Sequence, residues 1–234
     1  MKLNLPAFIA HRGAPLVAPE NTLAAFRAAQ EQGATWIECD VQLTRDAVPI
    51  IFHDFTLDRT SNGHGRVEKA EWREIQKLDA GSWFGAKFRG EKILTLREVL
   101  QFSSENKMAV NLELKCSDER SALLAEIVHE AIKHHDQPIL VSSFNYEVLV
   151  ALRRINLNVA LGLNCEEWHL SHISRAKKIE AYSIHVNQRD VNATLMEECR
   201  SNFLQVLAFT VNDSARAKTL HKLGVLSLFT DSLF

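Results

Sequence analysis

Short apolar runs alternate with longer amphipathic stretches along most of this 234-residue chain, and this alternation restricts the possible folds more than any other feature. The apolar runs predict strands at 7–10, 35–41, 109–114, 139–143, 158–162, 182–186, 205–210 and 225–229. The amphipathic stretches predict helices at 22–32, 95–105, 119–134, 145–154, 168–178, 192–200 and 213–222. Eight strands separated by seven helices favour an α/β fold of the (β/α)8 TIM barrel type. A doubly wound open sheet has the same alternation and is the alternative.

One segment, residues 48–94, breaks this rhythm. It contains an extra apolar strand at 48–53, several glycines and a short helix near 70–78. We therefore expect a small inserted subdomain after the second strand. No Gly/Ser-rich linker or low-complexity tract marks a boundary, so residues 1–234 are expected to form a single domain that includes this insertion.

The composition excludes several classes of partner. The formal net charge is −2, so nothing attracts the chain as a whole to nucleic acid or to an anionic membrane, and a bound anion needs a local site. No segment approaches the ~20 apolar residues of a transmembrane helix, and the N-terminal apolar run is too short for a signal peptide. The four cysteines show neither a CxxC pair nor a metal-like spacing. These features predict a reduced, cytoplasmic protein without stable membrane anchoring.

Polar residues recur at the carboxyl ends of the predicted strands, where a TIM barrel carries its chemistry. Glu38 and Asp40 lie two residues apart in one strand, so both carboxylates face the same side. Glu113 and Lys115 repeat this spacing in a later strand. Three acids without a cysteine among them would form an all-oxygen site, which favours Mg²⁺ or Ca²⁺ over zinc. In the alternative interpretation, the acids pair only with Arg12, Lys115 or solvent.

Two histidines, His11 and His53, each follow an apolar strand. Either one alone is more often a surface or structural histidine. Two of them near a candidate metal site indicate an acid–base pair, because imidazole titrates near neutral pH and one ring can accept a proton while the other donates one. Displacement at a phosphodiester requires both transfers. Arg12 and Lys115, together with a cation, would neutralise charge on the phosphoryl oxygens.

Together these residues resemble the glycerophosphodiester phosphodiesterase family. The matching segments occur in the family's order and cover nearly the whole chain: His11-Arg12-Gly13, Pro19-Glu20-Asn21-Thr22, Glu38-Cys39-Asp40, His53-Asp54, Leu57-Asp58-Arg59-Thr60, Glu113-Leu114-Lys115 and Phe209-Thr210-Val211-Asn212. Other segments look most like the bacterial cytoplasmic enzymes that work beside glycerol-phosphate uptake. The stretch from Gly224 to Asp231 departs from the family's usual Gly-Val-Asp-Gly-Ile-Ile-Thr-Asp, a difference that concerns the last turn of the barrel.

The resemblance implies a TIM barrel that hydrolyses glycerophosphodiesters, such as glycerophosphocholine or glycerophosphoethanolamine, to sn-glycerol 3-phosphate and an alcohol. It implies one divalent cation, Mg²⁺ or Ca²⁺, and assigns three roles: metal ligands Glu38, Asp40 and Glu113, catalytic residues His11 and His53, and phosphate contacts Arg12 and Lys115. Either the glycerol hydroxyl attacks first, giving a cyclic phosphate that water opens, or water attacks directly. The sequence leaves this choice open, together with the preferred alcohol and the oligomeric state.

Further residues receive weaker assignments. His185 ends another predicted strand and is assigned to the substrate pocket. Asn21 or Thr22 is expected to cap the following helix, and for Asn21 support of the metal or a catalytic histidine is the alternative. Three aromatic residues of the insertion, Trp83, Phe84 and Phe88, either wall the alcohol end of the substrate or form the insertion's own core. Two other functions remain open: a barrel that binds phosphodiesters without cleaving them, and a relative that acts on lipid phosphodiesters at a membrane and exposes apolar loops around the barrel mouth.

Overall fold

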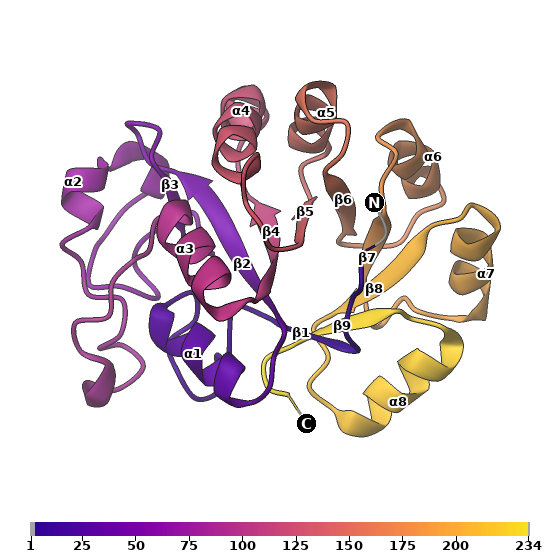
Figure 1. The fold of residues 1–234 in the computed structure, drawn as a ribbon, viewed down its shortest axis with the longest axis horizontal. Coiled ribbons are helices and arrows are strands. Elements are labelled where there is room, and N and C mark those ends of the chain that lie inside the picture. Colours follow the sequence, from indigo (N-terminus) through magenta and orange to yellow (C-terminus); the bar gives the residue numbers. More distant parts are fainter. Residues whose placement is uncertain (1–2, 234) are drawn as a thin grey trace.

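The computed structural model describes residues 3–233 and shows a ring of parallel strands surrounded by helices (Figure 1). The parallel strands of these residues are β1 (Phe8–Ala10), β2 (Trp36–Leu43), β4 (Ala109–Leu114), β5 (Ile139–Ser143), β6 (Ala160–Cys165), β7 (Ser183–Asn187), β8 (Gln205–Phe209) and β9 (Ser227–Thr230). Their order in the sheet is β1-β9-β8-β7-β6-β5-β4-β2, and a further pairing between β1 and β2 closes the ring. This closure confirms the predicted TIM barrel, and the doubly wound open sheet is wrong.

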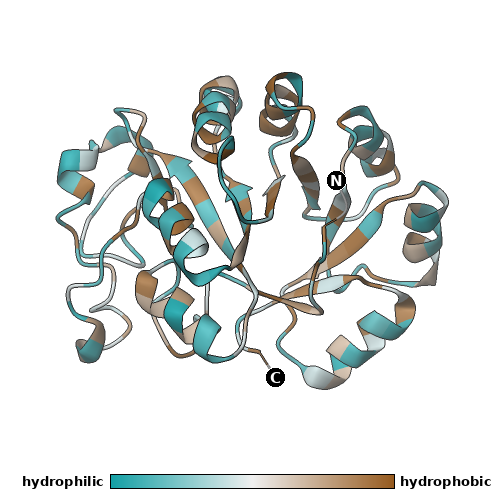
Figure 2. Ribbon diagram, in the orientation of Figure 1, coloured by the Kyte–Doolittle hydropathy of each residue, from teal (hydrophilic) through white to brown (hydrophobic). Residues whose placement is uncertain are grey.

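Helices follow the strands and cover the outside of the ring. They are α1 (Leu23–Glu31), α3 (Leu96–Asn106), α4 (Ser121–Ile132), α5 (Tyr146–Ile155), α6 (Ser171–Lys178), α7 (Ala193–Ser201) and α8 (Ser214–Leu223), with the short 3-10 helix η3 (Asp118–Arg120) before α4. Each of the seven α-helices carries hydrophobic residues among hydrophilic ones (Figure 2), as expected of a helix with one buried face. Side chains that cap the helix ends set where several of them begin. At α3, for example, Thr95 accepts from the backbone N–H of Glu98, whose carboxylate accepts from that of Thr95.

The predicted boundaries agree with the observed ones within a few residues, and among the strands β6 differs most. The sequence predicts a strand at 158–162, whereas β6 spans Ala160–Cys165. Asn156 Oδ1 accepts hydrogen bonds from the backbone N–H groups of Asn158 and Val159, which holds these residues in a turn before the strand. At the other end, Asn164 gives no apolar signal because it faces the polar part of the barrel interior.

The insertion at 48–94 contains β3 (Pro49–Ile51), the 3-10 helices η1 (Val67–Lys69) and η2 (Ala86–Phe88), and α2 (Trp72–Ile75). Strand β3 pairs antiparallel with β2 and lies outside the ring. The buried residues Ile50, Phe52, Leu57, Val67, Ile75, Ala80 and Ile93 form a separate small core. Since Ile51 packs in the main barrel core while the adjacent Ile50 packs in this small core, we propose that barrel and insertion fold as one domain.

The two ends of the barrel interior differ in polarity. One cluster of buried apolar residues, which includes Ile9, Trp36 and Leu140, fills the space between the strands. Toward the carboxyl ends, buried polar side chains such as Glu38 and Asn111 replace the apolar ones, and hydrophilic residues visibly interrupt β2 (Figure 2). This is the end at which TIM barrels carry their active sites. Among the described helices, none combines the length and the apolar character that crossing a bilayer requires.

Candidate active site

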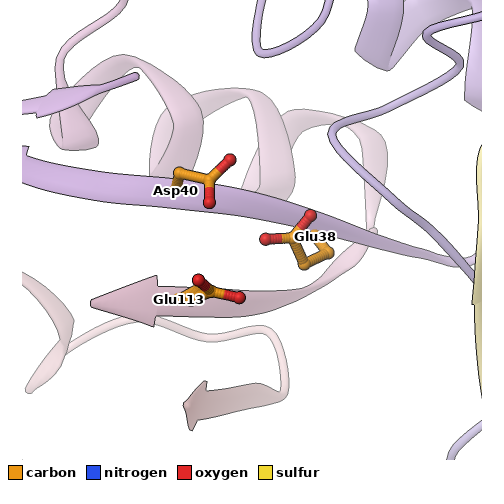
Figure 3. A group of neighbouring side chains, drawn as sticks. All are labelled: Glu38, Asp40 and Glu113. Carbon is orange, nitrogen blue, oxygen red and sulfur yellow. The ribbon is translucent and has the colours of Figure 1, made fainter. Parts of the chain in front are cut away.

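Three carboxylates meet where β2 and β4 pair at the carboxyl end of the barrel. Asp40 of β2 stands opposite Glu113 of β4 in the sheet register, and Glu38 lies two residues before Asp40 on the same face. One oxygen from each carboxylate lies within 4.8 Å of the others. Figure 3 shows the three side chains directed toward one another. Glu38 and Asp40 are buried, whereas Glu113 is half-buried.

Two cations and two amides surround these acids. Lys115 Nζ lies 2.8 Å from Glu113 Oε1 and 3.3 Å from Asp40 Oδ1, and Arg12 Nε lies 3.5 Å from Asp40 Oδ2. In addition, Asn164 Nδ2 donates to Glu113 Oε2 at 3.0 Å. The residues that sequence reasoning singled out as ligands and phosphate contacts therefore lie together. Direct pairing of the acids with Arg12 and Lys115, the alternative interpretation, is also present.

These pairings do not satisfy every carboxylate oxygen of the cluster. Glu38 Oε2 accepts from the backbone N–H of Arg12 at 2.9 Å, but its buried Oε1 has no hydrogen-bond partner in residues 3–233. Burial raises the pKa of Glu38 well above its ordinary value, and the charges of Asp40 and Glu113 raise it further. Burial alone would raise the pKa of Asp40 as well, but Lys115 and Arg12 bring it below its ordinary value. An unpartnered buried carboxylate oxygen inside an all-oxygen set fits a hard divalent cation.

Asn21 supports this set instead of capping a helix. Its Nδ2 donates to Asp40 Oδ2 at 2.8 Å, and its Oδ1 accepts from the backbone N–H of Asp40 at 3.3 Å. Thr22 is the N-cap of α1 and accepts from the backbone N–H of Ala25. Asn21 has a φ of 59°, in the left-handed region that asparagine tolerates better than most residues. The cap expected at Asn21 or Thr22 is therefore formed by Thr22, and Asn21 follows its alternative by contacting Asp40.

Each catalytic-candidate histidine has a carboxylate on its Nδ1. His11 Nδ1 lies 2.7 Å from Asp231 Oδ1, and Asn212 Nδ2 donates to the other oxygen of Asp231 at 2.6 Å. His53 Nδ1 lies 2.6 Å from Asp54 Oδ1. A carboxylate that accepts from Nδ1–H fixes the ring orientation and leaves Nε2 to exchange a proton with a ligand.

Arg59 of the insertion ties the two halves of the site together. It donates to both oxygens of Asp54, at 2.7 and 2.8 Å, and to both oxygens of Glu20, at 2.8 Å each. Glu20 in turn accepts from Arg12 at 2.9 Å. One bidentate guanidinium thus links the carboxylate behind His53 to the carboxylate behind Arg12.

Replacing Arg59 by lysine is expected to lower kcat/KM about tenfold, because an ammonium group cannot hold two carboxylates in bidentate pairs. If His53 loses its orientation, kcat should fall. If Arg12 loses its orientation, KM should rise. Steady-state kinetics with a glycerophosphodiester would measure both. Arg89→Lys, at the end of η2, is the matched control and should leave both constants unchanged. Equal kcat/KM in Arg59→Lys and the control would contradict the link.

A cavity of about 380 Å³ opens over the carboxyl ends of the strands. It is lined by His11, Arg12, Glu38, His53, Glu113, Lys115, Phe144, Asn164, Glu166, His185, Phe209, Thr210 and Phe229. Most residues assigned from the sequence therefore face one cavity. Asp40 and Asn21 are buried and are not among the described lining residues.

His185 lines the floor of this cavity, where the sequence assigned it to the pocket. Its Nε2 lies 2.9 Å from Ser183 Oγ, and its ring packs 5.1 Å from that of Phe229. Burial lowers the pKa of His185 to about 3, so the ring is neutral. A Cβ at Gly162 would lie 2.5 Å from the imidazole ring, so only glycine leaves room for it.

Sequence reasoning missed several residues of the site. Asp231 and Asn212 lie at predicted strand ends but received no role there, because Asp231 contacts His11 across 220 positions of the chain and Asn212 acts only through Asp231. Phe144 is a candidate for the rim of the pocket and Phe209 belongs to a family-matching segment, but the sequence assigns neither to the site; both line the cavity. Conversely, Phe84 packs edge to face against Trp83 and Phe88, with ring centroids 5.5 and 5.4 Å apart, and none of the three is in the described lining of this cavity. The possible aromatic wall predicted in the insertion is therefore not found there.

The family model of the glycerophosphoryl diester phosphodiesterase family matches residues 11–233. This chain belongs to that family. A glycerophosphodiester phosphodiesterase from Caldanaerobacter subterraneus subsp. tengcongensis is 38% identical over 95% of this chain and 93% of its own length. The structure of an Oleispira antarctica phosphodiesterase in complex with the product sn-glycerol-3-phosphate is 37% identical, with a TM-score of 0.93, and the match covers 97% of this chain and 93% of that one.

A glycerophosphodiester phosphodiesterase from Agrobacterium tumefaciens also shares the fold, with 29% identity, a TM-score of 0.81 and a match over 97% of both chains. These likenesses confirm the predicted resemblance and the assignment of the chain as a phosphodiesterase of the glycerophosphoryl diester phosphodiesterase family. They extend over the final stretch as well. There β9 pairs with both β1 and β8 despite its divergent sequence.

Proposed function

We propose that this protein hydrolyses glycerophosphodiesters to sn-glycerol 3-phosphate and an alcohol, with one divalent cation and two histidines as acid and base. The observation that carries the proposal is that two carboxylate-backed histidines line the same cavity as Glu38 and Glu113, which form a three-carboxylate cluster with Asp40. The Caldanaerobacter and Oleispira relatives support the substrate class, by the activity named for the first and the product bound to the second.

The negative charge of the phosphodiester would be neutralised at one side of the cavity. Arg12 and Lys115 both line it and would contact non-bridging phosphoryl oxygens. Glu38, Asp40 and Glu113 would hold the cation, which when bound supplies positive charge to the phosphoryl group and lowers the pKa of an attacking hydroxyl. The oxygen ligands suit Mg²⁺ and Ca²⁺ alike.

Proton transfer falls to the two histidines. Burial lowers the pKa of His53, although the charge of Asp40 opposes this, so His53 favours the neutral form that a base requires. We assign His53 as the base that accepts the proton of the attacking hydroxyl, and His11 as the acid that donates to the leaving alkoxide. The same assignment serves attack by the glycerol hydroxyl and attack by water.

Metal removal tests the proposal most directly. Protein treated with a chelator should release no sn-glycerol 3-phosphate from glycerophosphocholine, and addition of Mg²⁺ or Ca²⁺ should restore release. Coupled detection of the product, with a panel of head groups, would measure this. Equal affinity for substrate and product without turnover under either ion would favour the non-catalytic binding barrel. Undiminished release after chelation would contradict the metal dependence.

A lipid phosphodiester is a second candidate substrate, because apolar side chains are exposed in loops after β1, β3 and β5. Leu16 is 60% exposed, Phe55 51% and Phe144 41%. Exposed apolar loops of this kind would be expected around the mouth of an enzyme that meets a bilayer. Rates with a lysophospholipid and with glycerophosphocholine, compared under the same conditions, distinguish the two substrates. We expect the water-soluble substrate to react faster.

A further inference from the structure

The charges of the catalytic cavity are concentrated on one side. Arg12, Lys115 and the acid cluster lie at the ends of β1, β2 and β4. The lining residues at the ends of β5 to β8 include a single residue that is charged at neutral pH, Glu166, because the buried His185 stays neutral. The part of a substrate that extends beyond the phosphate on this side therefore meets one negative charge and no positive one among the described lining residues.

Two aromatic rings form walls on this same side. Phe144 follows β5, and Phe209 ends β8. Their ring centroids lie 5.6 Å apart with an angle of 79° between the ring planes, and both side chains line the cavity. Glu166, which follows β6, lies along the same lining, is exposed, and makes no ion pair within residues 3–233. Aromatic faces and an unpaired carboxylate are the groups that attract an alkylammonium ion.

Resting on the proposed function, we infer that Phe144, Phe209 and Glu166 form the subsite for the leaving alcohol and select alcohols that carry an ammonium group. The aromatic rings contact the alkyl surface and positive charge of the head group, and Glu166 supplies the opposite charge. This identifies the preferred substrate class as glycerophosphodiesters of amino alcohols.

A second cavity shows why the ammonium group belongs here and not on the opposite side of the phosphate. This cavity, of about 260 Å³, shares Lys115 with the catalytic cavity and is lined in addition by Arg66, Glu68 and Arg120. Two guanidinium groups and one ammonium group outnumber the single carboxylate, so this side repels a cation. The surfaces on the two sides of Lys115 thus differ in charge, and a cationic head group is favoured on the side of Glu166.

Kinetics with two head groups test the subsite. Glycerophosphocholine and glycerophosphoglycerol carry the same phosphate, but only the first has a cationic head group. Glu166→Gln should lower the ratio of their kcat/KM values about two- to fivefold, and Glu166→Lys more than tenfold, through KM of the choline substrate. The neighbouring Glu167→Gln makes the same charge change outside the cavity lining and should leave the ratio unchanged. An equal effect of Glu166→Gln on both substrates, or none, would overturn the inference.

Binding without turnover separates this inference from the proposed function. Calorimetric titration of the metal-loaded wild-type protein and Glu166→Gln with phosphocholine should show weaker binding to the variant. Titration with sn-glycerol 3-phosphate should show equal binding to both proteins. This result would hold even if neither diester were hydrolysed. Phosphocholine affinity that is unchanged in the variant would refute the subsite, whatever the activity.

Discussion

Replacing Glu38 by glutamine is expected to abolish hydrolysis and, in the same molecule, to stabilise the metal-free fold. Burial and the nearby charges of Asp40 and Glu113 raise the pKa of Glu38. An acid whose pKa is raised in the folded state lowers the free energy of unfolding as the pH rises above its unfolded pKa, so Glu38 destabilises the metal-free protein at neutral pH. Glutamine has the same shape and can still accept from Arg12 N–H, but it carries no charge. The free energy of unfolding of metal-free Glu38→Gln should exceed that of metal-free wild-type protein by about 1–3 kcal/mol.

Thermal unfolding measures this effect, because each kcal/mol shifts Tm by roughly 2–4 °C in a chain of this size. Wild-type protein should gain Tm when Mg²⁺ or Ca²⁺ is added, and Glu38→Gln should not, since it lacks one of three carboxylate ligands. Loss of several kcal/mol of charge stabilisation should reduce turnover at least about 10³-fold. Glu31→Gln, on the exposed end of α1, is the control for the change of side chain. A metal-free Tm below that of wild type would contradict the argument.

The barrel could be predicted because each buried strand or helix face produces a periodic pattern of hydrophobic residues in the local sequence. Runs such as 139–143 coincide with β5, since every second residue in a strand of this fold packs against helices. The pair Glu38 and Asp40 was informative for the same reason. Residues that are two positions apart in a strand lie on the same face, whatever the rest of the fold. The relative orientation of Glu38 and Asp40 could therefore be predicted from the sequence.

The supporting contacts could not be predicted in this way, because they join segments that no local pattern relates. Asp231 reaches His11 only after closure of the ring brings β9 beside β1. Arg59 reaches Glu20 because the insertion folds back over the loop before α1. Neither arginine nor aspartate in a loop differs locally from a solvated residue, and their roles emerge only when the tertiary structure places opposite charges together.

Each single replacement, His11→Ala or His53→Ala, should lower kcat about 10²- to 10⁴-fold. KM should change little, because Arg12 and Lys115 remain to contact the phosphate. His134→Ala, on an exposed segment after α4, is the control and should retain full activity. Wild-type kcat in either of the two variants would remove that histidine from the mechanism.

A substrate with a better leaving group separates the two roles. In a p-nitrophenyl ester of glycerophosphate the departing oxygen needs no proton, so this substrate should restore much of the rate of His11→Ala but not that of His53→Ala. The reverse pattern would exchange the assignments of acid and base.

The pH dependence provides an independent check on His53. A base acts in its neutral form, so a lowered pKa moves the acidic limb of kcat/KM below the ordinary histidine value of 6.5. The hydrogen bond that His53 Nδ1–H donates to Asp54 opposes this shift, because a carboxylate on Nδ1 favours the protonated ring. Asp54→Asn should therefore move the acidic limb to still lower pH while it lowers kcat. Movement of the limb to higher pH would show that another group, and not His53, limits the rate in acid.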